Sequence, residues 1–163
     1  MLFLQHICCV FEISAYNDVI ETKQPLIRIG ILDIEKQTQI EQALSANSQF
    51  TIEKNGDSLA VTNEDGIDAF LYFGAQQITV ISPLFPASDI AEKERAKLNE
   101  TILKTHMVSP LTSMAINTIN GEDYYVAFGA LSVDSKLDVV IEEVDVLFAN
   151  VPDLLEAYWF KEQ

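Results

Sequence analysis

The sequence is poor in basic residues, and this shortage excludes two classes of partner. Only 10 lysine and arginine residues stand against 25 aspartate and glutamate residues, which leaves a net charge of −15. A field of this sign repels phosphate backbones and anionic lipid headgroups, so we expect neither nucleic acid nor a membrane surface as a partner. A basic protein segment would suit the field, and a requirement for solubility would also account for it.

Cysteine is scarce as well. Cys8 and Cys9 are the two cysteines of the chain, and they are adjacent. No second pair exists that could complete a disulfide framework or a zinc site. The first eleven residues, MLFLQHICCVF, are apolar, but this run is too short to span a bilayer and lacks the basic start of a secretory signal. We therefore expect a cytoplasmic protein without direct membrane insertion.

The sequence contains no recognised catalytic motif. It has no G-x-S-x-G, P-loop, G-x-G-x-x-G or H-E-x-x-H pattern. His6 lies in the N-terminal stretch, and His106 falls at a predicted helix C-terminus, where its ring interacts favourably with the helix dipole. The paired carboxylates fall on turns or on the polar face of a helix, where we expect water to solvate both groups of each pair: Glu64–Asp65, Glu122–Asp123 and Glu142–Glu143. We predict no enzymatic activity, no catalytic residue, no cofactor and no metal.

What the chain does contain is enough apolar sequence for one domain. It has 163 residues, of which 48% are hydrophobic, so it can bury a sizeable core without disulfide bonds or a structural metal ion. We expect a single α+β domain over residues 29–163, with Pro25 near its boundary. Residues 1–28 are predicted to be an N-terminal extension: an extra edge strand, an amphipathic appendage or the product of a misassigned start.

The first half of the domain changes from helical to strand periodicity. The spacing predicts a helix over 33–47, with Asp33 as its N-cap. Alternating residues then predict a four-stranded antiparallel meander over 49–82. Its turns are expected at 55–56, where Asn-Gly is a strong hairpin signal, at 64–66 and at 74–76. Pro83 and Pro86 are predicted to end these strands.

The second half predicts a helix, a hairpin and a final helix. Ser88 or Asp89 should cap a helix that ends near His106, with an inward side made of Ile90, Ala91, Leu98, Ile102 and Leu103. Asn120-Gly121 should connect two strands.

The last helix should follow a cap at Asp134 or Ser135 and be kinked or restarted by Pro152. Its outer face is predicted to carry Asp138, Glu142, Glu143 and Asp145. The predicted order of elements is α-ββββ-α-ββ-α.

Residues 102–151 carry the motifs of a known bacterial family. They are the hydrophobic-K-T-H run at 102–106, S-P-L-T-S around Pro110 and YYVAFGALS from Tyr124 to Ser132. On these motifs the chain resembles the YjfI-like family of bacterial proteins, a domain of unknown function. The resemblance implies no catalytic residue. Members tend to be encoded beside a homologue of phage-shock protein A, which implies an accessory role in an envelope-stress system.

The element order is also similar to that of type III secretion chaperones. These are small acidic α/β dimers whose helices pack on one side of an antiparallel sheet. That fold commonly has five strands, whereas six are predicted here, and a shared fold does not fix a function.

We interpret the chain as a non-enzymatic protein-binding adaptor or chaperone-like module that forms a homodimer. Candidate partner contacts are Tyr124, Tyr158 and Trp159. One alternative is a structural subunit of a larger assembly, with an exposed apolar surface at Leu154, Leu155, Tyr158, Trp159 and Phe160. A second alternative is an enzyme whose unrecognised site uses His106 beside a buried carboxylate.

Overall fold

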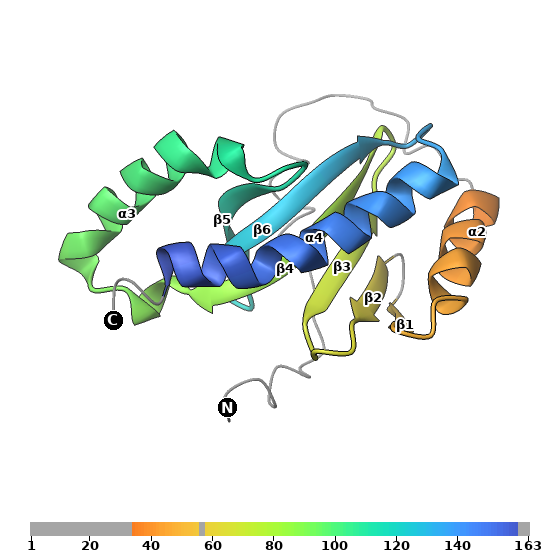
Figure 1. Cartoon of the computed structure of the whole chain (residues 1–163), viewed down its shortest axis with the longest axis horizontal. Coiled ribbons are helices and arrows are strands. Elements are labelled where there is room, and N and C mark those ends of the chain that lie inside the picture. The colour runs from red at the N-terminus through yellow and green to blue at the C-terminus, as the bar shows by residue number, and fades with distance from the viewer. Residues whose placement is uncertain (1–33, 56–57, 160–163) are drawn as a thin grey trace.

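A six-stranded antiparallel sheet and three α-helices make up the described part of the chain (Figure 1). The structure is a computed structural model, and it describes residues 34–55 and 58–159. The elements are α2 Ile34–Ser45, β1 Thr51–Asn55, β2 Ser58–Thr62, β3 Asp68–Phe73, β4 Gln77–Pro86, the 3-10 turn η1 Ala87–Asp89, α3 Glu92–Thr105, the 3-10 turn η2 His106–Val108, β5 Ser113–Ile119, β6 Glu122–Ser132 and α4 Leu137–Tyr158. This order confirms the predicted α+β class and the α-ββββ-α-ββ-α sequence of elements.

The helices cover one face of the sheet. The strand order is β1-β2-β3-β4-β6-β5, so β4 and β6 are central and β5 is an edge. α4 crosses this face over β4 and β6, α2 lies beside β1, and α3 lies near the other end of α4 (Figure 1). One apolar core fills the space between the sheet and the helices. In the described part of the chain, no helix is both long and apolar enough to cross a membrane.

The predicted hairpin turn at Asn120-Gly121 is present. Ile119 pairs with Glu122, and the two residues between them have φ values of 53° and 82°. These positive angles define the type I′ geometry for which Asn-Gly is suited, since glycine has no Cβ to oppose it. The hairpin joins β5 to β6. Asn55 ends β1 and pairs with Ser58, so it is a strand residue and not part of a two-residue turn with Gly56, which corrects the prediction at 55–56. Gly56 itself lies outside the described residues, as do Asp33 and the proposed extension at 1–28.

Pro83 and Pro86 do not end the sheet, which corrects the prediction. β4 continues through both prolines as far as Pro86. The pairing of β4 with β3 ends at Ile81, so beyond that residue β4 pairs only with β6 among the described strands. A register shift between Pro83 and Phe85 adjusts the pairing with β6. Prolines are tolerated there because one side of the strand needs no ladder hydrogen bond.

The predicted caps of α3 and α4 are wrong. Ala91 precedes α3 and Lys136 precedes α4, and neither makes a side-chain capping bond. Ser88 instead donates to Glu122 Oε1 at 2.7 Å, which ties η1 to β6. A short 3-10 turn occupies 87–89, so the helix begins later than a capping residue at 88 or 89 would require.

The inward side of α3 is narrower than predicted. Leu98 and Ile102 are buried, and Ile90 before the helix is buried too. Leu103 is 73% exposed and Ala91 is also exposed, which corrects both assignments. Leu98, Ile102 and Thr105 follow the i, i+4, i+7 spacing that faces α4, and Leu103 lies one residue off that stripe.

α4 is one continuous helix that contains Pro152, so the predicted restart is wrong. Pro152 removes one backbone donor from the helix. Apolar residues on both sides of it hold the helix on the sheet: Val144, Leu147, Phe148, Val151 and Leu154 are all buried. Tertiary packing therefore outweighs the local cost of the proline.

Candidate protein-binding surfaces

The three predicted contact residues do not lie on one surface. Tyr158 is 6% exposed, and its hydroxyl lies 2.7 Å from the hydroxyl of Thr105. The half-buried ring of Trp159 stacks on Phe85 at a centroid distance of 6.0 Å. Tyr124 is half-buried on the opposite face of the sheet, because it alternates with Tyr125, which points into the core. Burial and then the charge of Glu122 raise the pKa of Tyr124.

The apolar C-terminal cluster, predicted as a surface of an assembly subunit, belongs to the core. Leu154 and Tyr158 are buried, and Leu155 and Trp159 pack against the core as partly buried side chains. Phe160 lies outside the described residues. The structural-subunit alternative therefore loses the surface on which it rested.

Glu143 faces the sheet instead of solvent, which corrects its predicted place on the outer face of α4. It is 4% exposed and packs on Gly129 of β6. A Cβ on Gly129 would lie 1.5 Å from Glu143 Oε1, so the glycine makes the room that the carboxyl occupies. Burial, and secondly the charge of Glu142, raise the pKa of Glu143 above its usual range.

Replacing Glu143 by glutamine should change how stability depends on pH. An acid whose pKa is raised on folding stabilises the fold when protonated, and this contribution is lost as the pH rises from the ordinary glutamate pKa to the raised pKa. The free energy of unfolding of Glu143→Gln, minus that of the wild type, should therefore increase through this window and then level off. Urea unfolding at a series of pH values measures the difference.

The readout is how this difference in the free energy of unfolding varies with pH, because the new glutamine amide changes it by an amount that does not vary with pH. Glu156→Gln, at an exposed position of the same helix, is the matched control, because it removes a carboxylate of α4 without touching the buried one. A difference for Glu143→Gln that does not vary with pH would contradict a buried, perturbed carboxyl.

The alternative of an enzyme requires His106 beside a buried carboxylate, and the buried carboxylate in the described part of the chain is Glu143. His106 is the C-cap of α3, as its predicted position at the helix end requires, and its Nδ1 has no hydrogen bond. The carboxyl of Glu143 packs on Gly129 and is closed off from solvent, so a substrate cannot reach it in this conformation. Among residues 34–55 and 58–159, no group of three or more histidine, cysteine, aspartate or glutamate residues could hold a metal ion.

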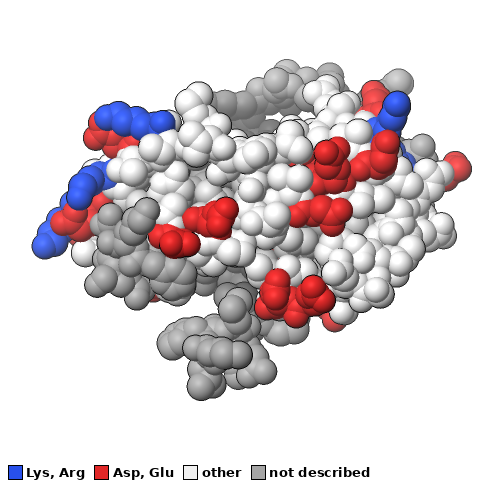
Figure 2. Space-filling model, in the orientation of Figure 1, with Lys and Arg blue, Asp and Glu red and all other residues white. Residues whose placement is uncertain are grey.

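Acidic side chains gather on the outward side of α4, and we call this surface the acidic α4 face. It consists of five exposed residues: Asp138, Glu142, Asp145, Asp153 and Glu156. Figure 2 shows carboxylates spread over the side of the molecule on which α4 lies, while the lysines and arginines gather at its ends. The sequence pattern predicted three of these residues and wrongly included Glu143.

A hollow of about 160 Å³ adjoins the acidic α4 face. The rings of Phe50 and Phe148 line it, at a centroid distance of 5.5 Å. Carboxylates of Glu64, Asp65 and Asp145 also line it, and burial raises the pKa of Asp145. Apolar rings beside carboxylates suit a lysine or arginine side chain, whose stem is apolar and whose end is cationic.

A second surface is apolar, and the sequence patterns did not reveal it. We call it the α3–β5 surface: the exposed side chains of Leu103, Met107, Val108, Leu111 and Ile116, from the end of α3 through η2 to β5. Their exposures run from 48% for Ile116 to 80% for Met107. η2 contacts both α3 and β5, so these side chains belong to adjoining elements.

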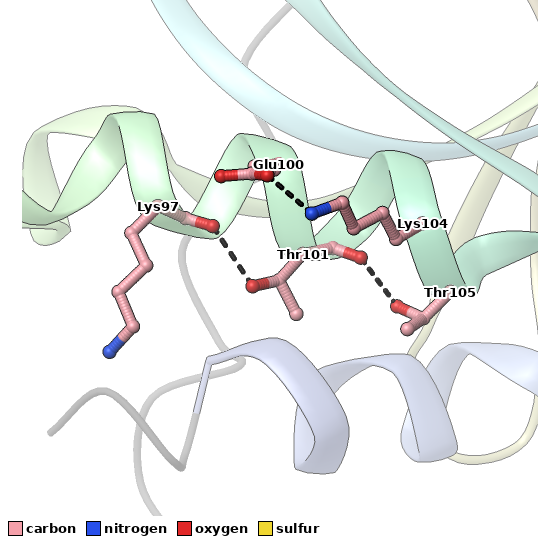
Figure 3. Close-up of polar contacts among 5 residues, drawn as sticks. All are labelled: Lys97, Glu100, Thr101, Lys104 and Thr105. Atoms are coloured by element: carbon pink, nitrogen blue, oxygen red, sulfur yellow. Dashed lines mark hydrogen bonds and ion pairs between the residues drawn. The ribbon is translucent and has the colours of Figure 1, made fainter.

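Several polar groups of α3 beside this surface have their partners within the helix (Figure 3). Lys104 pairs with Glu100 one turn earlier. Thr101 donates to the carbonyl of Lys97 at 2.9 Å, and Thr105 donates to that of Thr101 at 2.7 Å. The run of apolar residues at 107, 108 and 111 after a helix end was a usable signal for an exposed surface.

The structure has a small α+β fold that is similar to the type III secretion chaperone fold. A chain from the HopA1–SchA chaperone–effector complex aligns with a TM-score of 0.55 and 12% identity over 76% of this chain and 98% of that one. A chain from the ExsC–ExsE complex aligns with a TM-score of 0.56 and 8% identity, covering 78% and 96%. At these identities the likeness concerns the fold alone.

The chain belongs to the family described as an uncharacterized protein conserved in bacteria (DUF2170), which matches residues 23–160. The uncharacterized protein YjfI of Escherichia coli strain K12 is 26% identical over 119 residues, which cover 73% of this chain and 88% of YjfI. The predicted resemblance to the YjfI-like family is therefore confirmed.

Proposed function

We propose that this protein is a non-enzymatic, cytoplasmic, chaperone-like adaptor that binds another protein and acts as a homodimer. Its fold is also that of a chain in a chaperone–effector complex, which supports binding over catalysis. The resemblance to the YjfI-like family supports a homologue of phage-shock protein A as the partner, in an accessory role to an envelope-stress system.

The acidic α4 face and its hollow carry this proposal. A partner segment that contains lysine or arginine would place its cationic ends on Glu142 and Asp145 and its apolar stems on Phe50 and Phe148. The excess of negative charge would also speed its encounter with a basic segment. The proposed partner surface is thus polar at its rim and apolar in its hollow.

Neutralising two carboxylates of this face should weaken partner binding. For Glu142→Gln/Asp145→Asn, we expect the Kd for a purified homologue of phage-shock protein A to rise about tenfold, which corresponds to ~1.4 kcal/mol. The Kd should also respond less to salt, because fewer charges are screened. Isothermal calorimetry with the full chain at two salt concentrations measures both effects.

The matched control is Glu53→Gln/Asp134→Asn, which removes the same number of charges at exposed positions outside the acidic α4 face. It should raise the Kd about twofold or less, through the general field alone. Equal effects of the two double variants would move the partner site elsewhere. No binding by the wild type would reject this partner, and affinity capture from cells without any protein partner would reject the adaptor function.

A further inference from the structure

Within residues 34–55 and 58–159, the outer edge of β5 is less protected than the other edge of the sheet. β5 has the sequence SMAINTI, without a charged residue, proline or glycine, and among the described strands it pairs with β6 alone. Proteins normally guard such edges with charges, prolines or short strands, because unpaired backbone groups invite another strand. The opposite edge, β1, is shorter and carries Glu53 and Lys54.

The α3–β5 surface lies beside this unguarded edge. Ile116 belongs to the edge strand itself, and η2, with Met107 and Val108, contacts the same strand. Five large apolar side chains next to unpaired backbone groups form a surface that is costly to leave in water. A strand from another chain would satisfy the backbone groups, and its neighbouring apolar side chains would cover the α3–β5 surface.

The charge distribution indicates that the added strand comes from a second copy of this chain. Residues 88–105 hold four acidic and four basic residues, so the remaining 21 acidic and six basic residues carry the whole net charge of −15. Two such molecules repel each other over most of their surfaces, but not at α3. In Figure 2, blue and red atoms lie side by side over the end of the molecule that α3 occupies.

Two-fold symmetry also favours an interface without unpaired charge. In a symmetric pair of antiparallel strands, residues near the axis face their own counterparts, so any charge there would face a like charge. β5 has no charge to oppose itself. Lysines and glutamates alternate along α3 and could pair with those of the second α3.

We propose that a second copy of this chain binds the α3–β5 surface, with the two β5 edges paired antiparallel to form one sheet of twelve strands. The inference rests on the homodimer of the proposed function and assigns its interface. It leaves the acidic α4 face free for the other protein.

The double variant Val108→Lys/Ile116→Lys tests this interface, because it places like charges near the axis. In light scattering, the wild type should have twice the 18.2 kDa mass of one chain, and the variant should fall to the mass of one chain. The matched control, Val139→Lys, changes an exposed apolar residue of α4 outside the surface and should remain a dimer. A wild-type monomer at every concentration, or a dimeric double variant, would overturn the proposal.

Hydrogen exchange on the unmodified protein provides a test that does not depend on a variant folding. The amides of β5 should exchange more slowly as the protein concentration rises through the dimerisation range, while those of β1 should not change. Dimerisation without added protection of β5 would place the interface elsewhere. A monomeric double variant that still binds the partner protein would separate this interface from the adaptor function, which is tested by partner binding alone.

Discussion

Replacing Phe85 by alanine should lower the free energy of unfolding by about 3–5 kcal/mol. Phe85 is 1% exposed and stacks on Tyr125 at a centroid distance of 4.8 Å and on Trp159 at 6.0 Å. The Tyr125 hydroxyl in turn donates to Asn99 Oδ1 at 2.7 Å. Truncation would leave a cavity where β4, β6, α3 and the end of α4 meet.

Urea unfolding followed by far-ultraviolet circular dichroism measures this loss. Phe85→Leu should lose less, because it keeps most of the side-chain volume. Val139→Ala, at an exposed position of α4 outside the α3–β5 surface, should stay within about 0.5 kcal/mol of the wild type. If Phe85→Ala fails to fold, Phe85→Leu still reports the direction. A loss below ~1 kcal/mol for Phe85→Ala would contradict a packed aromatic core at this position.

Replacing Gly129 by alanine should destabilise the protein by about 1–3 kcal/mol, because the added methyl group takes the space of the Glu143 carboxyl. The new Cβ would lie 1.5 Å from Oε1 and 2.6 Å from Cδ of Glu143. The buried glutamate must then change rotamer, or α4 must move away from β6. Either adjustment disturbs the contact of α4 with the centre of the sheet.

A double-mutant cycle with Glu143→Ala identifies the cause. In that background, Gly129→Ala should cost much less, with a coupling free energy on the order of 1 kcal/mol or more. Ala130→Val changes the next residue of the strand, which is exposed, and serves as the control. Additive effects of Gly129→Ala and Glu143→Ala would show that the two positions do not meet.

Local patterns predicted the order of elements and the turn between β5 and β6. Asn120-Gly121 is one example, because its positive φ values are a property of the two residues themselves. The caps failed because Ser88 and Asp134 can bond to turns as well as to helix ends. In the structure, the Ser88 hydroxyl donates to Glu122 of β6, and Lys136, not Asp134, is the residue that precedes α4.

The candidate surfaces were predicted only in part. The acidic character of α4 follows from composition and helical spacing, because repeated carboxylates on one side of an amphipathic helix face water. The hollow beside it required Phe50, Glu64 and Phe148 to come together from separate segments. The α3–β5 surface required knowing that β5 is an edge, which the order of strands along the chain does not specify.

The sequence by itself determined the element order, the Asn120-Gly121 turn, the family and the acidic field of this protein, since each follows from neighbouring residues or from composition. Only the tertiary structure decided that Glu143 is buried and that Leu103 is exposed. Helical spacing predicts an apolar stripe but not its limits, which depend on what lies opposite. Glu143 fits inside because Gly129 has no side chain, and Leu103 stays outside because the stripe of Leu98 and Ile102 already faces the core.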